Sequence, residues 1–303
     1  IMNEYGADAA RFFILFGASP ESGLEWSEEG VGFAYKFIKN TFFLLTEAST
    51  KFRRKKTIRD TLIIYNLNKT IKQVTNSLEK IAIRDAVNLI VQFASDLIKY
   101  KNEGVIKQIF EECREKLTRM LHPIAPHMTE EIWEIIGKEG YISLAFWPAY
   151  DEKLLTDEND FKWKLMNSIV DDVNNIKLVM KQDQLKKISI IIADGWKFKF
   201  YSVLMSLIDE TRDQGEIMKT IMKESDLKPH GKSISQITAK ILKNIGKYSK
   251  ISLSSEEEFQ FFQEIKPILK KKYQCDIEVA TEKDKKEKKA AQALPGRPAI
   301  IIS

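Results

Sequence analysis

Apolar residues recur every three or four positions through the middle of the chain, which is the spacing of one face of an α-helix. The clearest stripes are Ile64, Leu67, Ile71, Val74 and Leu78, then Ile83, Val87, Ile90, Ala94 and Leu97, then Ile106, Phe110, Cys113, Leu117 and Met120. Short connections join these three segments, and short connections favour antiparallel neighbours. The pattern predicts an antiparallel helical bundle over residues 31–150.

The first 30 residues predict a short helix from about Ala7 to Phe16, followed by a glycine-rich loop in which Trp26 is a large apolar anchor. Ser27 precedes two glutamates, a pattern typical of a helix N-cap, so a second helix should run from Glu28 to about Ala48. The apolar pattern then lapses at KFRRKKTIRD, which should form a solvated loop between helices.

The pattern changes after an acidic, polar stretch at residues 151–160, where we expect a linker. Residues 161–303 mix helical spacing with β-branched runs at KKISIIIAD, at CDIEVATE and at the closing PGRPAIII. Strands interleaved with helices are typical of a small α+β domain. The chain as a whole is therefore predicted to be mainly α: a leading segment of residues 1–30, an antiparallel helical bundle, and a small α+β C-terminal domain.

Charge changes this picture only in the last third. From Ile217 onward the chain has 18 Lys and Arg against 11 Asp and Glu, whereas the residues before it are nearly balanced. A basic surface suits a polyanion such as nucleic acid, although lysine-rich surfaces also serve only to keep a protein in solution. No uninterrupted apolar run approaches the ~20 residues needed to span a bilayer, and two distant cysteines fit a reducing compartment. We expect a soluble, cytoplasmic protein without a membrane partner.

Catalytic motifs are scarce. The sequence contains no phosphate-binding loop of the GxxxxGK[ST] or GxGxxG type. His122 and His127 lie five residues apart across two prolines, which is poor spacing for a metal site, and we expect both to be structural. The acid pairs Asp171–Asp172 and Glu130–Glu131 are adjacent and so point to different faces of a helix. Although tertiary contacts could still assemble a site, the residues favour a binding or docking module without a metal over an enzyme.

Several motifs resemble one family in the correct order along the chain. YGADAARFFILFGASPESGLEWSEEG, residues 5–30, resembles the segment that follows the KMSKS loop in class I aminoacyl-tRNA synthetases. Within it, SPESGLEWSEEGV is similar to leucyl-tRNA synthetases of the archaeal and eukaryotic type. HPIAPHMTEEIWE resembles the anticodon-binding-type helical domain, which the valyl, isoleucyl and methionyl enzymes share. LKPHGKSISQITAKILK and LPGRPAIII resemble the archaeal-type C-terminal domain.

The resemblance implies that the chain is a C-terminal fragment whose role is to position RNA. In the family, the fold that binds ATP and Mg, and the editing domain, lie N-terminal to this region, so the fragment is expected to hold no cofactor and to be inactive alone. The full enzyme joins leucine to tRNA(Leu) at the expense of ATP. The bundle would lean on the tRNA body, and the C-terminal domain would contact the tip of the long variable arm through Arg297, Pro298, Ala299, Ile300, Ile301 and Ile302.

Three groups of residues are candidate RNA contacts. They are Lys51, Arg53, Arg54, Lys55, Lys56 and Arg59 in the basic loop; Lys270, Lys271 and Lys272 at a helix end; and Arg297, Ile300, Ile301 and Ile302 near the C-terminus. Each has a plainer interpretation: a solvated loop, cations that complement a helix dipole, and an edge strand that packs its isoleucines.

Other functions stay open at this stage. The chain could be a docking subunit that completes a split synthetase together with a catalytic partner, which predicts an uncovered apolar surface around Tyr5–Gly30. It could also be the equivalent region of a valyl- or isoleucyl-type enzyme, or a fragment without a present function. Tyr5, Gly6, Asp8 and Arg11 match the family segment that supports the KMSKS loop, and without that loop we expect Asp8 and Arg11 to lack partners.

Overall fold

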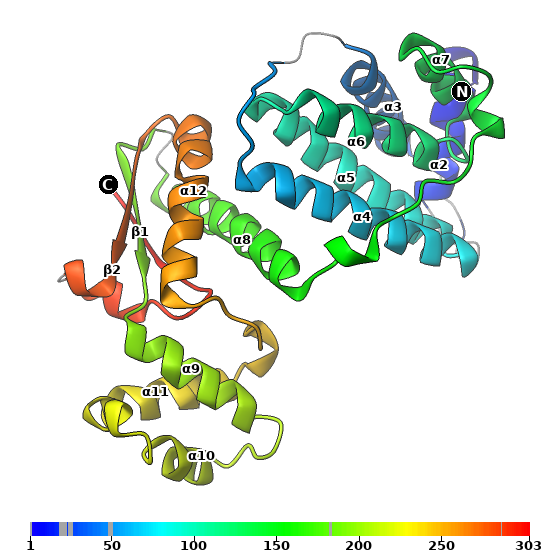
Figure 1. Cartoon of the computed structure of the whole chain (residues 1–303). Coiled ribbons are helices and arrows are strands. Elements are labelled where there is room, and N and C mark those ends of the chain that lie inside the picture. The colour runs from blue at the N-terminus through cyan, green and yellow to red at the C-terminus, as the bar shows by residue number, and fades with distance from the viewer. Residues whose placement is uncertain (1, 18–22, 24–26, 48–50, 182–183, 286) are drawn as a thin grey trace. The chain divides into compact units, whose positions relative to one another are not determined.

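The computed structural model describes residues 2–17, 23, 27–47, 51–181, 184–285 and 287–303 of the chain (Figure 1). They form two compact units, unit 1 from Ile1 to Thr156 and unit 2 from Asp157 to Ser303. The division falls inside the stretch 151–160 predicted to be a linker, and the last residues of that stretch begin a helix of unit 2. The predicted loop anchor Trp26 lies outside the described residues.

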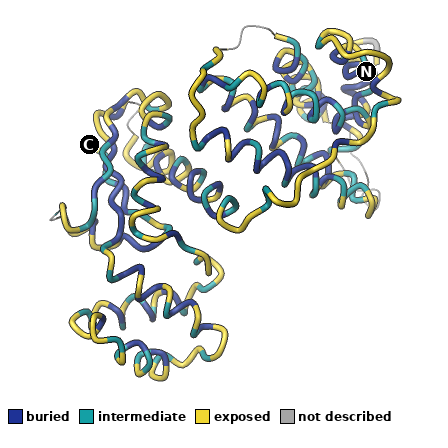
Figure 2. The backbone as a smooth tube through the Cα atoms, in the orientation of Figure 1, coloured by how far each residue is buried: buried dark blue, intermediate teal, exposed yellow. Residues whose placement is uncertain are grey.

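Unit 1 is built from helices, as the periodicity predicted. Their bounds are α1 Met2–Tyr5, α2 Ala7–Gly17, α3 Glu28–Thr46, α4 Ile58–Glu79, α5 Ile83–Glu103, α6 Lys107–Leu121 and α7 Pro126–Ile135, with short 3-10 turns at Ile142–Leu144 and Glu152–Leu154. Helices α4, α5 and α6 pack on one another, and α2 packs against α3 and α5. The three predicted apolar stripes face inward here, with Leu67, Val87 and Leu117 fully buried (Figure 2).

The start of α3 shows why the N-terminal helices pack closely. Ser27 is the N-cap, as its sequence context predicted, and its Oγ accepts a hydrogen bond from the Gly30 backbone N at 3.2 Å. Gly30 faces the ring of Phe13, and a Cβ added there would lie 2.7 Å from Phe13 Cε2. Glycine at this position therefore lets α2 and α3 approach each other.

Unit 2 combines a small sheet with helices. Its elements are α8 Asp157–Met180, β1 Lys187–Ile192, α9 Gly195–Leu207, α10 Gln214–Ile221, α11 Gly231–Leu242, α12 Ser255–Tyr273, β2 Asp276–Thr281 and β3 Ala299–Ile302, with 3-10 turns at Ser225–His230, Ile245–Lys247, Glu282–Asp284 and Ala290–Gln292. The strand order is β2-β1-β3, in which β1 is parallel to β2 and antiparallel to β3. The three β-branched runs seen in the sequence are the three strands, which confirms the α+β prediction.

The helices of unit 2 form two groups. Helix α12 packs on β1 and β2, whereas α9, α10 and α11 build a separate helical cluster at one end of the unit (Figure 1). Leu204, Ile217 and Ile241 lie in the core of that cluster. No described helix has both the length and the apolar character that crossing a membrane requires.

A buried lysine connects α9 to the final segment of the chain. The Lys197 side chain is 2% exposed, and its Nζ donates to the carbonyl oxygens of Ala291 and Ala293 at 2.7 and 2.9 Å. It also lies 2.8 Å from Oε2 of Glu282. A buried ammonium is tolerated only when it is paired in this way. Lys197 thus fixes the course of the chain just before the closing strand β3.

Candidate nucleic-acid interface

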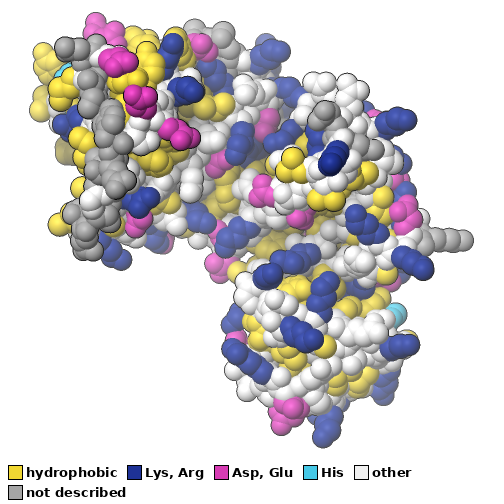
Figure 3. Space-filling model, turned by 180° about the vertical axis from the view of Figure 1, so that it is seen from behind, with side chains coloured by type: hydrophobic (Ala, Val, Ile, Leu, Met, Phe, Trp, Pro, Cys, Tyr) yellow, Lys and Arg dark blue, Asp and Glu magenta, His cyan; other side chains and the backbone are white. Residues whose placement is uncertain are grey.

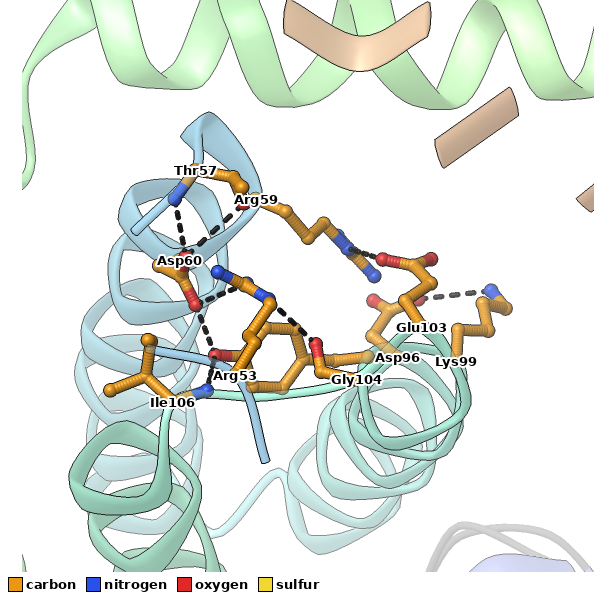
Figure 4. Close-up of polar contacts among 10 residues, drawn as sticks. Arg53, Thr57, Arg59, Asp60, Asp96, Lys99, Glu103, Gly104 and Ile106 are labelled. Carbon is orange, nitrogen blue, oxygen red and sulfur yellow. Dashed lines mark hydrogen bonds and ion pairs between the residues drawn. The ribbon is translucent and has the colours of Figure 1, made fainter. Parts of the chain in front are cut away.

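The basic loop of residues 51–57 is held in place by one of its own arginines (Figure 4). Arg53 Nε donates to Gly104 O at 2.9 Å, Nη1 donates to Lys55 O at 2.5 Å, and Nη2 pairs with Asp60 Oδ1 at 2.6 Å. These three contacts use all the nitrogens of the guanidinium. Arg53 thus has a structural role in this arrangement, and its predicted contact with phosphate stays a prediction.

Asp60 is the acceptor at the centre of this network. Besides Arg53, its carboxylate accepts hydrogen bonds from the Tyr100 hydroxyl and from the Thr57 backbone N, the latter at 2.7 Å. Burial alone would raise the pKa of Asp60, but the hydrogen bonds from Arg53, Tyr100 and Thr57 together outweigh it and hold that pKa below its ordinary value. The carboxylate is therefore ionised at neutral pH and fixes the start of α4.

The other predicted loop cations divide between the interior and the surface. Arg59 belongs to α4 rather than to the loop, its side chain is 4% exposed, and its Nε lies 3.0 Å from Oε2 of Glu103. A guanidinium buried in this way is not displayed to an external phosphate. Lys51, Arg54, Lys55 and Lys56 are exposed. The backbone pairs with Val105, since Arg53 N donates to Val105 O and Val105 N to Lys51 O, each at 2.9 Å, so these cations stand on a fixed segment.

The closing strand β3 lies at an edge of the three-stranded sheet. Ser303 and Lys187 exchange two backbone hydrogen bonds, at 3.0 and 2.9 Å, and Ile302 stands opposite Ile188 in the register. In an antiparallel pair, alternate residues direct their N–H and C=O groups away from the partner. The backbone groups of Ile300 and Ile302 therefore point to the open edge.

The side chains of this strand serve packing. Ile300 is 4% exposed, whereas Ile301 and Ile302 are half-buried. The sequence left open whether these isoleucines recognise RNA or fill a core. The fold allows both uses, because packing occupies the side chains and the edge still offers the backbone.

The turn before β3 positions Arg297. Leu294 and Arg297 exchange two backbone hydrogen bonds, at 2.9 and 2.8 Å, across Pro295 and Gly296. Gly296 has φ of 69°, a left-handed conformation, and a Cβ there would lie 2.8 Å from Phe161 Cζ. Its N–H donates to Oε2 of Glu258 at 2.8 Å. The PGRP sequence thus forms a tight turn that only glycine fits.

Arg297 is exposed, and two contacts fix the position of its guanidinium. Its Nη2 donates to Lys247 O at 2.7 Å, and its guanidinium carbon lies 4.7 Å from the centre of the Tyr248 ring. Tyr248 was not among the sequence candidates. It is distant from Arg297 in the sequence and follows no motif, so the fold alone brings the two together.

The three lysines at the end of α12 are exposed. Lys270 pairs with Asp276 at 2.8 Å, and Lys272 Nζ lies 5.8 Å from the centre of the Tyr273 ring. Their place in the last helical turn complements the helix dipole. A role of Lys270, Lys271 and Lys272 in RNA contact stays a prediction.

The expectation that Asp8 and Arg11 lack partners is wrong. Asp8 Oδ2 accepts from the Met128 backbone N at 2.6 Å, and His127 Nδ1 lies 2.9 Å from Asp8 Oδ1. Arg11 donates to the carbonyl oxygens of Pro123 and Ile124 at 3.2 and 3.4 Å. Helix α2 packs against α7, so an Asp8 carboxylate meets the unpaired N–H groups at the start of that helix.

The remaining titratable candidates serve the fold. His122 Nδ1 lies 2.8 Å from Thr129 Oγ1, which confirms a structural role at the helix junction. Glu130 accepts from the backbone N of Ile142 and Ser143 at 3.0 and 3.3 Å. Cys113 is buried without a disulfide, and burial raises the pKa of its thiol. In the described part of the chain, no three His, Cys, Asp or Glu side chains gather as metal ligands.

The chain is similar to a known domain family and to several longer proteins. A family model described as the anticodon-binding domain of tRNA ligase matches residues 60–192, which extend from α4 through β1. The leucine–tRNA ligase of Pyrococcus horikoshii is 28% identical over 99% of this chain and 31% of its own length. That of Methanocaldococcus jannaschii is 27% identical over 100% of this chain and 31% of its own length.

The solved structure of the Agrobacterium radiobacter K84 agnB2 LeuRS–tRNA–LeuAMS ternary complex aligns with 51% of this chain and 21% of that one, at 24% identity. Its TM-score of 0.44 is too low to establish a shared fold. The curated relatives are about three times as long as this chain, which spans 31% of their length. Over its whole length the chain is therefore similar to about 31% of the length of archaeal leucine–tRNA ligases, and its residues 60–192 match the family model of the anticodon-binding domain of tRNA ligase.

Proposed function

We propose that this chain binds and positions leucine tRNA as part of a leucyl-tRNA synthetase, with the basic loop of unit 1 on the tRNA body and β3 of unit 2 at the long variable arm. The observation that supports this most is the open edge of β3, because the outward backbone groups of Ile300 and Ile302 stand beside the exposed Arg297. Unpaired bases at the end of an RNA arm offer donors and acceptors to such an edge.

The two surfaces contribute different kinds of binding energy. Lys51, Arg54, Lys55 and Lys56 form a fixed cationic segment, which suits phosphates and has no preference for sequence. The edge of β3 can form directional hydrogen bonds with bases, so it would supply the preference for a long variable arm. Because the similar proteins are leucine–tRNA ligases, we favour leucine tRNA as the ligand over the tRNAs of a valyl- or isoleucyl-type enzyme.

The test is binding of the full chain to leucine tRNA and to the same tRNA with a shortened variable arm, each at two salt concentrations. We expect the shortened tRNA to bind more weakly at both salts, because hydrogen bonds to bases are less sensitive to salt than phosphate contacts. Equal, salt-sensitive binding of the two tRNAs would contradict the variable-arm role.

A single variant sharpens this test. Ile302→Pro removes the N–H that points to the open edge and leaves the hydrogen bonds between β3 and β1 in place, which is the situation that an edge strand tolerates. The matched control Ile302→Ala removes the side chain and keeps the N–H. The preference for the long arm should fall in the proline variant and persist in the alanine variant.

Docking to a catalytic portion is a second candidate function. Met2, Ile14 and Phe33 in the N-terminal helices are 67%, 57% and 42% exposed, an apolar character that the docking hypothesis predicted for this region. About two thirds of the length of the relatives lies outside the part that this chain matches, and this surface could pack against that portion. In that case Ile14→Asp should prevent association with a leucyl-tRNA synthetase that lacks its C-terminal third. It should leave tRNA binding by the isolated chain unchanged.

A further inference from the structure

Two hollows adjoin each other in unit 2, and the stacked pair of Arg297 and Tyr248 stands between them. The larger has a volume of about 550 Å³ and the smaller about 300 Å³, and Asp172, Tyr248, Arg297 and Pro298 line both. We propose that these hollows together hold one unstacked nucleotide of a bound RNA, with its base in the larger hollow and its phosphate at the smaller. This inference rests on the proposed tRNA-binding function and adds a specific base-binding site to it.

The larger hollow has the surfaces that a nucleobase needs. Phe161, Tyr201 and Pro295 line it and are buried, so they offer an apolar floor. The guanidinium of Arg297 rests with one face on Tyr248. Bases stack on aromatic rings and on arginine planes in sites that bind single strands. A base that enters this hollow would extend the existing stack.

The polar groups of the hollow favour a base with an amino group. Asp172 has no hydrogen-bond partner among the described residues, and its carboxylate can only accept hydrogen bonds when it is ionised. Asp172 is exposed, and partial burial raises the pKa of its carboxylate, opposed by nearby Arg297. An exocyclic amine of adenine, cytosine or guanine would donate a hydrogen bond to this carboxylate. Uracil has no such amine.

The smaller hollow has the charge that a phosphate needs. Lys240 and Lys289 line it together with Arg297, and neither lysine forms an ion pair within the described part of the chain. Asp172 is its one acidic lining residue. Lys and Arg side chains also gather over the α9–α11 end of unit 2 in the view of Figure 3. Such cations bind the phosphate backbone of the RNA, while the stacked base determines where along the RNA the protein binds.

The site is formed before any ligand arrives. The turn that displays Arg297 is closed by its own backbone hydrogen bonds and anchored by Glu258, and Arg297 is in turn bonded to the carbonyl of Lys247. Little ordering is therefore left to oppose binding. A preformed stack of this kind distinguishes the site from a mobile lysine patch.

The experiment uses the full chain and a pentaribonucleotide with 2-aminopurine between uridines, whose fluorescence is quenched when the modified base stacks. We expect saturable quenching. Arg297→Lys keeps the positive charge but loses the planar stacking surface, and Tyr248→Ala removes the platform. Each should weaken binding by about fivefold or more. Ser168→Trp, at an exposed position that lines only the larger hollow, should block the base and abolish the quenching.

The matched control is Arg84→Lys, at an exposed position near the start of α5 in unit 1, which should leave the quenching unchanged. Circular dichroism and thermal unfolding of each variant check that it is folded. Unchanged quenching in Arg297→Lys and Ser168→Trp would overturn the base-binding site.

Binding of leucine tRNA, measured on the same proteins, separates this inference from the function it rests on. If tRNA binds and the pentamer shows no quenching that depends on the hollow, the site is overturned and the proposed function stands. If the pentamer quenches through the hollow and tRNA fails to bind, the site stands and the proposed function falls.

Discussion

The basic loop of unit 1 and the closing turn of unit 2 display cations by opposite means. In the loop, residues close in sequence build part of the support, since Arg53 bonds to Lys55 and Asp60, and the segment at Gly104 and Val105 completes it. In the turn, Arg297 depends on Tyr248 and on Glu258, which other segments of the chain supply. The first arrangement is partly local, whereas the second depends throughout on residues that lie far apart in the sequence.

The difference shows that the density of cations in a sequence is a poor guide to their use. Residues 51–59 contain the densest basic run that the sequence offered as a contact, yet Arg53 and Arg59 serve the interior of unit 1. In unit 2 a buried acid, Glu258, holds the turn that presents a single exposed arginine. The pairing of each cation therefore has to be known before it is assigned to RNA.

The largest expected effect comes from a substitution that breaks the support of the basic loop in unit 1. Asp60→Ala removes the acceptor of Arg53, Tyr100 and Thr57 and leaves a partly buried guanidinium without its partner. The free energy of unfolding of unit 1 should fall by about 3–5 kcal/mol. Denaturant unfolding of the full chain measures this loss, and hydrogen exchange assigns it to unit 1. Asp85→Ala, at an exposed position in the first turn of α5, is the matched control and should cost less than about 1 kcal/mol.

Asp60→Ala also tests how the free energy of unfolding of unit 1 depends on pH. The pKa of Asp60 lies below its ordinary value of 3.8 in the folded protein, so the unfolded chain binds the proton more readily. The stabilisation is fully present above the unfolded pKa and is lost as the pH falls through the folded one. The difference between wild type and Asp60→Ala should therefore shrink in strong acid. A difference that is constant down to pH 2 would contradict the ionic account.

The next effect concerns the long-range arrangement, where the dependence of stability on pH has the opposite sign. Burial raises the pKa of Glu258 to about 7 against the hydrogen bond from Gly296 N. Between its ordinary pKa of 4.5 and about 7, the folded state binds more protons than the unfolded state, so stability falls as the pH rises. Glu258→Gln keeps an acceptor for Gly296 and removes the charge. It should stabilise unit 2 by about 2–3 kcal/mol at pH 8 and have little effect at pH 4.

Thermal unfolding across this pH range measures the effect of Glu258→Gln. Glu256→Gln is the matched control, because it changes an exposed glutamate in the same helical turn and should not alter the pH dependence. Destabilisation of unit 2 by Glu258→Gln at pH 8 would mean that the turn needs the ionised carboxylate.

The sequence predicted the elements well and the site only in part, for physical reasons. Helical stripes such as Leu67 to Val74 and the β-branched run of β1 are local patterns that burial imposes, so both could be read directly. The partners of Arg59 and Arg297 depend on helix packing and on a turn, which leave no periodic trace. For the same reason Asp8 was expected to be unpaired, although α7 supplies its partner.

The smallest expected effect sharpens the comparison by using RNA itself as the probe. If the basic loop contacts tRNA phosphates, Arg54→Ala or Lys56→Ala should each reduce the log–log slope of tRNA affinity against salt by about 0.7–0.9, one phosphate contact each. Arg59→Lys keeps the charge at a buried position and should leave that slope unchanged while it weakens the pairing with Glu103. Equal slopes in all three variants would remove the loop from the RNA interface, and recognition would then rest on unit 2. A reduced slope in Arg59→Lys alone would mean that α4 opens when RNA binds, since the guanidinium is otherwise shielded from a phosphate.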